Sequence, residues 1–141
     1  MRPLNLSLLL GLLSLACTDP IQRSHINANV PDRGDFDRIL HRDLESYFAN
    51  DRKEAGVSVA FEFLREGPTQ TGIAFPKYYL WVRIGEGARP EDRGAVRVAA
   101  VEKQQFEVTH FLSEAEIRRN GAIEQVFPPA VCDRIRTRLR Q

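Results

Sequence analysis

Cysteine is scarce in this sequence of 141 residues, with Cys17 and Cys132 as the only two. Paired C-x-x-C spacings, which are typical of zinc sites, are therefore absent. The chain also contains no G-x-S-x-G, H-E-x-x-H, Walker A or dinucleotide-binding motif. These absences leave no recognisable catalytic, metal or cofactor site, so we predict no cofactor and favour a protein that is not an enzyme.

Histidine is almost as rare, and no two of the three histidines have the spacing of metal ligands. His25 falls in a polar stretch, His41 on the polar side of a predicted helix, and His110 in a predicted strand. We expect His110 near the core, as a structural histidine rather than a general base. A nucleophile–base pair of Cys132 and His110 has no local motif to support it.

Long hydrophobic runs are limited to one, Leu6 to Ala16, which only two serines and a glycine interrupt. A membrane-spanning helix needs about 17–25 apolar residues, so this run is too short to span comfortably. Arg2 precedes the run and small residues follow it. This order is typical of a secretory signal peptide, which we predict over residues 1–16.

The end of the run, Leu13-Ser14-Leu15-Ala16-Cys17, resembles the lipobox of bacterial lipoproteins. The resemblance implies cleavage between Ala16 and Cys17. It also implies that Cys17 receives a diacylglycerol on its sulfur and a fatty acyl chain such as palmitate on its amino group. Because Thr18 rather than aspartate follows, it further implies anchoring in the outer membrane on the periplasmic side, with the lipid bilayer as a partner. Anchoring in the inner membrane is the alternative.

A second interpretation of these letters stays open. Ser14 and Leu15 stand in the reverse of the usual lipobox order, and Ser14-x-Ala16 also fits ordinary signal peptidase. The product would be a secreted protein, and a Cys17–Cys132 disulfide could close it in an oxidising compartment. However, Cys132 borders a predicted apolar helix stripe, and a buried free cysteine behaves as a small hydrophobe. The lipoprotein interpretation is therefore favoured.

Neither charge is in excess after the signal peptide. Without Arg2, the 20 basic residues become 19, against 19 acidic residues. A formally neutral chain lacks the basic composition of nucleic-acid-binding domains. We predict no nucleic acid partner.

Residues 17–34 are polar and without periodicity, which predicts a tether that links the anchor to a single domain over residues 35–141. The domain begins with a helix over 35–50, because apolar residues recur there at helical spacing. Asp35 is the expected N-cap, its carboxylate accepting from a first-turn amide. The apolar face comprises Phe36, Ile39, Leu40, Leu44, Tyr47 and Phe48.

Four strands are predicted next, over 56–64, 71–84, 95–101 and 106–112, with Pro76 as a bulge or as the true start of the second. Alternation places two sets of side chains on opposite faces of that second strand: Tyr78, Leu80, Val82 and Ile84 on one, and Tyr79, Trp81 and Arg83 on the other. In the last strand, the same rule places Phe106, Val108 and His110 on one face.

Short helices follow the strands. Ser113 and Glu116 have the spacing of a capping box, and Asn120-Gly121 is a helix stop. The last helix begins at Pro128-Pro129, and we interpret its later arginines as cations that stabilise the helix end. A basic patch that faces anionic lipid headgroups is the alternative. The predicted fold is therefore α+β: one long N-terminal helix packed on a four-stranded antiparallel sheet, followed by short C-terminal helices. Cystatin-like and NTF2-like architectures are analogies for this order.

Tyr79, Trp81 and Arg83 are the candidate partner surface, since aromatic residues and arginine are enriched at interfaces. The alternative is that the C-terminal helices cover this face. The functional hypothesis is a membrane-anchored periplasmic lipoprotein that acts as a non-catalytic binding or accessory module, with a protein partner in the cell envelope. A periplasmic hydrolase with a cleft between helix and sheet is the alternative from another class.

Overall fold

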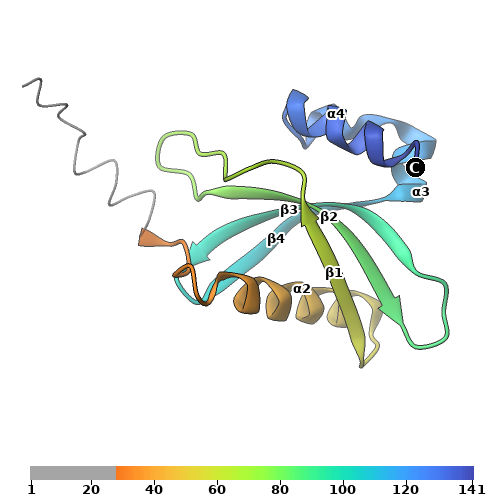
Figure 1. The fold of residues 1–141 in the computed structure, drawn as a ribbon, viewed down its shortest axis with the longest axis horizontal. Coiled ribbons are helices and arrows are strands. Elements are labelled where there is room, and N and C mark those ends of the chain that lie inside the picture. Colours follow the sequence, from red (N-terminus) through yellow and green to blue (C-terminus); the bar gives the residue numbers. More distant parts are fainter. Residues whose placement is uncertain (1–27) are drawn as a thin grey trace, which may run out of the picture.

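The computed structural model describes residues 28–141, so the predicted signal peptide, Ala16, Cys17 and most of the tether lie outside the described residues. Helix α2 (Phe36–Arg52) precedes four strands and a C-terminal group of short helices. The strands form one antiparallel sheet in the order β1-β2-β3-β4 (Figure 1). The predicted α+β fold is confirmed. The remaining elements are β1 (Val57–Phe63), β2 (Lys77–Glu86), β3 (Asp92–Glu102), β4 (Gln105–Ser113), α3 (Glu114–Asn120), the 3-10 helix η1 (Ala122–Gln125) and α4 (Pro129–Arg138).

Helix α2 lies across one face of the sheet and buries its apolar stripe there (Figure 1). The predicted spacing is correct, because Leu40, Leu44 and Phe48 are completely buried. The helix meets alternate side chains of the strands, and together they form the first core. Its strand residues are Val57, Val59, Tyr78, Leu80, Val82, Ile84, Val96, Val98, Ala100 and Phe106.

The opposite face is covered by α3, η1 and α4, which build a second core against β2 and β3 (Figure 1). Tyr79 and Trp81 are only 4% and 5% exposed in this core. The interpretation of these two residues as a partner surface is therefore wrong, whereas Arg83 remains exposed. The C-terminal helices carry apolar side chains, and these side chains are buried by packing against this face of the sheet. Those side chains are Ile117, Ile123, Phe127, Val131, Cys132 and Ile135.

A bulge in β4 overturns the predicted orientation of His110. Val98 pairs with Val108 and Arg97 pairs with His110, so Thr109 is an extra residue. An extra residue reverses the alternation beyond it. Phe111 consequently packs against the first core, with its ring centroid 4.9 Å from that of Phe48. His110 lies on the other side of the sheet and is exposed, not near the core.

The predicted start and end of α3 are both confirmed. The Ser113 hydroxyl accepts from the Glu116 amide at 3.2 Å, and the Glu116 carboxylate accepts from the Ser113 amide at 2.8 Å. Gly121 ends α3 in the left-handed conformation, with φ of +62°.

Two other predicted boundaries are correct only in part. Asp35 is the N-cap residue of α2, but its side chain makes no cap, because its backbone is helical and its carboxylate accepts instead from Arg38. The second strand begins at Lys77 rather than at residue 71, which confirms the alternative that Pro76 marks its start. The preceding residues form a hydrogen-bonded loop.

Gly94 lies in β3 where the backbone and side chains of β4 leave no room for a Cβ. A Cβ at this position would meet the Leu112 carbonyl oxygen and would lie 2.6 Å from Cε2 of Phe111. We expect Gly94→Ala to lower the free energy of unfolding by about 1–3 kcal/mol through overpacking, as measured by urea denaturation. Gly34→Ala is the control, since no heavy atom lies within 4 Å of its added Cβ. Equal stability of the two variants would contradict this packing.

Candidate functional site

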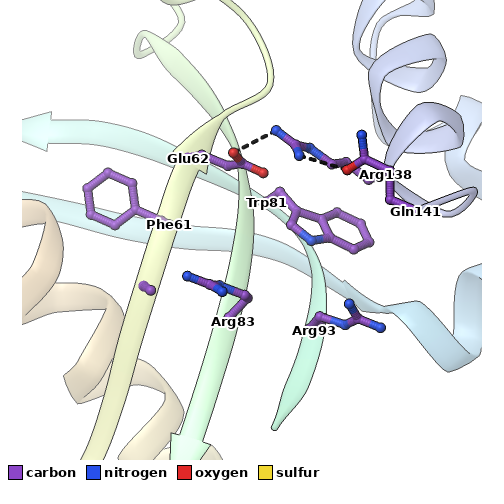
Figure 2. A pocket seen from close by; sticks show the side chains of 8 residues that line it. Phe61, Glu62, Trp81, Arg83, Arg93, Arg138 and Gln141 are labelled. Atoms are coloured by element: carbon purple, nitrogen blue, oxygen red, sulfur yellow. Dashed lines mark hydrogen bonds and ion pairs between the residues drawn. The ribbon is translucent and has the colours of Figure 1, made fainter.

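A hollow of about 330 Å³ lies on the sheet face that carries the C-terminal helices. It exists because the helices cover this face only in part: Trp81 of β2 is buried beneath them, whereas Ala60 of the edge strand β1 is exposed. Figure 2 shows the side chains around it, which come from three strands and from the end of α4. The lining residues are Ala60, Phe61, Glu62, Trp81, Arg83, Arg93, Arg138 and Gln141.

Three guanidinium groups characterise the hollow. Arg83 of β2 and Arg93 of β3 are directly opposite one another in the strand register. Arg138 reaches the hollow from the last turn of α4 (Figure 2). Glu62 is the one carboxylate among the lining side chains, which by themselves carry a formal charge of +2. Glu91 and Glu114 pair with Arg83 and Arg93 at the rim, and with these two carboxylates the cluster is formally neutral.

Each arginine holds one carboxylate at the rim. The Arg138–Glu62 distance is 2.6 Å, the Arg93–Glu114 distance is 3.0 Å and the Arg83–Glu91 distance is 3.6 Å. The arginine side chains are between 36% and 58% exposed. A guanidinium has five N–H donors, so a single carboxylate leaves donors for a further acceptor. The hollow is thus suited to an anion.

A second cluster of charges, around Glu86, has a structural role. Arg52 of α2 donates to Glu86 and to Asp92, both at 2.7 Å, and Arg89 lies 3.3 Å from Glu86. The hydrogen bond from Arg52 holds the pKa of the buried Glu86 carboxyl below its usual range, whereas a hydrogen bond with Glu86 raises the pKa of Glu54. These bonds connect the C-terminal end of α2 to the loop end of the β2–β3 hairpin.

The residues considered for covalent chemistry lie in different surroundings. Cys132 is 1% exposed within the second core, where its Sγ donates to the Phe127 carbonyl oxygen at 3.3 Å. Its burial, which the sequence predicted, raises the pKa of the thiol. His110 is exposed, and its Nδ1 lies 2.7 Å from Nη2 of Arg97. Partial desolvation, together with the Arg97 charge, lowers the pKa of His110.

Of the candidate partner residues, only Arg83 points into the hollow as an exposed group, while Trp81 forms part of its wall (Figure 2). Sequence reasoning missed Glu62, Arg93 and Arg138. The pairing of Arg83 with Arg93 depends on strand register, which alternation within one strand does not give. From the sequence, Arg138 is assigned to the helix end or to a lipid-facing basic patch, and not to this hollow.

Within residues 28–141, no helix has the length and apolar character needed to cross a membrane. The same part of the chain brings together no group of three or more histidine, cysteine or acidic side chains that could hold a metal ion. No family model matches the chain, and searches of curated proteins and of solved structures found no similar protein.

The burial of Cys132 predicts an unreactive thiol. In a Cys17→Ser chain, we expect no thiol to react with an aromatic disulfide reagent in the folded state, and one thiol to react after unfolding in guanidinium chloride. A raised pKa lowers the fraction of the thiol present as the reactive thiolate, and burial in the core blocks access of the reagent. A positive control is Cys17→Ser/Ala88→Cys, whose new thiol lies on an exposed loop. A folded Cys17→Ser chain that reacts as fast as this control would contradict the packing of α4.

Proposed function

We propose that this protein is a lipid-anchored lipoprotein of the bacterial cell envelope and that its domain is a non-catalytic binding module. The binding site is the arginine hollow, and its ligand is an envelope component that presents carboxylate or phosphate groups. The observation that carries the proposal is that three arginines line one open hollow. Guanidinium groups match the geometry of carboxylates and phosphates, often with two parallel hydrogen bonds.

The register of the sheet supports an anionic ligand. Like charges directly opposite one another on neighbouring strands are destabilising, and Arg83 and Arg93 occupy such positions. Glu91 and Glu114 each offset part of this repulsion, and an anion bound in the hollow would offset more of it. Ligand binding would therefore also stabilise the folded domain, as any ligand specific for the native state does.

The chemistry of the lining also favours binding over hydrolysis. The lining offers guanidinium and amide donors, an indole, and one carboxylate already paired with Arg138. In addition, the interface between α2 and the sheet, where a hydrolase cleft was hypothesised, is filled by the first core. A protein partner that inserts an acidic side chain fits this lining.

The burial of Cys132 supports acylation of Cys17 over the disulfide alternative. Cys132 packs in the second core beside Val131 and Ile135, and a disulfide at this thiol would require α4 to unpack. Lipidation needs no such rearrangement. Two or more acyl chains give stable membrane attachment where a single chain is marginal. We propose the periplasmic side of the outer membrane, which the lipobox resemblance and Thr18 imply.

Anion binding can be followed through Trp81, the only tryptophan and part of the wall of the hollow. We expect citrate or phosphate to change the fluorescence of the mature chain in a saturable way. Arg93→Gln should weaken binding about tenfold or more, since hydrogen bonds to charged groups contribute about 1.5–3 kcal/mol each. The matched control is Arg119→Gln, an exposed arginine on α3 that does not line the hollow.

Two outcomes would contradict the binding site: the unaltered protein shows no saturable response to either anion, or Arg93→Gln binds as tightly as Arg119→Gln.

The anchor is tested by the intact mass of the protein from bacterial membranes. We expect a chain that begins at Cys17 and carries acyl mass, and we expect Cys17→Ser to be released from the membrane fraction. Cys132→Ala is the control, since this residue takes no part in acylation. A mature chain without acyl mass and two hydrogens lighter than calculated would instead identify the secreted, disulfide-closed form.

A further inference from the structure

The large apolar side chains that remain exposed lie in the loop between β1 and β2 or directly before it. In the part of the chain that the structure describes, these side chains are Phe63 at 43% exposed, Ile73 at 98% and Phe75 at 44%. Phe63 ends β1, and the other two lie in residues 64–76 between the strands. Apolar side chains that are gathered together and exposed are typical of sites that bind a protein or a membrane.

Internal hydrogen bonds hold this loop in shape. Thr69 and Lys77 exchange two backbone hydrogen bonds of 2.9 and 2.8 Å at its base. Within it, the Ala74 amide donates to the Thr71 carbonyl oxygen at 3.1 Å, and Gly72 takes the left-handed conformation with φ of +56°. The tip is thus a tight turn that presents Ile73 to solvent. Side chains held in this way need little ordering when they bind.

The loop lies at the end of the domain where the described chain begins. In the antiparallel sheet, the end of β1, the start of β2 and the β3–β4 turn all meet at this end (Figure 1). Val30 packs against the first core, and Asp32 pairs with Lys103 of the β3–β4 turn at 3.3 Å. Only the ten residues 18–27 separate Cys17 from the first described residue. Ten residues span at most about 33–36 Å.

We propose that the loop of residues 71–75 is a second membrane contact, in which Ile73 and Phe75 enter the interface of the bilayer that holds Cys17. The inference rests on the acylation of Cys17 in the proposed function. The short tether keeps the loop at a high local concentration near the membrane, so even a weak contact is populated. Apolar groups enter such an interface while cations stay at the level of the headgroups. Lys77, whose Nζ lies 5.9 Å from the ring centroid of Phe75, supplies such a cation.

The proposal also gives the domain an orientation. Arg83 lies near the end of β2 and Arg93 near the start of β3, away from the end that carries the loop. With the loop on the bilayer, these two arginines would face into the periplasm. The anchored domain would then present its anion site to components beyond the membrane surface.

The experiment places a fluorescent label at the loop tip. In Ile73→Cys, the new thiol is the one available to a nitrobenzoxadiazole label, because Cys17 is acylated and Cys132 is buried. Ala88→Cys is the matched control, since residue 88 is exposed in the β2–β3 loop at the opposite end of the sheet. The acylated proteins are reconstituted into vesicles of phosphatidylethanolamine and phosphatidylglycerol, with and without doxyl-labelled lipid.

We expect the label at position 73 to show blue-shifted emission and at least twofold quenching by doxyl lipid, and the label at position 88 to show neither. Phe75→Cys should respond as Ile73→Cys does. Since Ile73 is 98% exposed, its replacement leaves the core intact.

Equal responses at positions 73 and 88 in a protein of confirmed acyl mass would overturn the membrane contact and leave the anchor standing. Absence of acyl mass would overturn the anchor and this inference with it. Shielding of the label in a Cys17→Ser chain without vesicles, increasing with protein concentration, would show a contact between copies and would also overturn the inference.

Discussion

The two central strands are buried on both faces, and this constraint determines where the molecule can interact with anything else. Antiparallel sheets commonly pack one face and leave the other in water. Here α2 covers one side of β2 and β3, while α3, η1 and α4 cover the other. Leu80 and Val82 are completely buried in one core, and Tyr79 and Trp81 are nearly so in the other. The parts of these two strands that stay open include the ends that carry Arg83 and Arg93, beside the edge strand β1.

The exposed parts of the sheet differ from one another because the helices cover its strands unevenly. β1 is an edge strand with one buried side, and its exposed outer side borders the arginine hollow. An edge strand with unpaired backbone groups is prone to pairing with other chains, and charged side chains reduce that tendency. Glu62 and its partner Arg138 lie beside this edge. The same charges can thus protect the strand and shape the site.

Burial separates the structural role of the Glu86 cluster from the binding role that we propose for the arginine hollow. Glu86 is buried, and its bonds to Arg52 and Arg89 must stay made, because a buried charge without a partner is costly. Arg83 and Glu91 are both at least half exposed and 3.6 Å apart. Exposed ion pairs of this kind contribute about 0–1 kcal/mol. A ligand can therefore displace Glu91 from Arg83 at little cost, which suits a site that binds and releases an anion.

Local sequence patterns predicted the helices and strands well. The arginine hollow, in contrast, depends on how neighbouring strands pair, which such patterns do not give. The helical spacing of Leu40, Leu44 and Phe48 and the capping box at Ser113 are set by neighbours in the sequence, and both predictions are confirmed. The bulge at Thr109 has no signal of its own, so the side of the sheet that His110 takes could not be predicted. Strand register likewise decides that Arg83 meets Arg93. Alternation correctly placed Trp81 opposite the first core, yet it could not tell a covered face from an open one, since both require only that the side chain point away from α2.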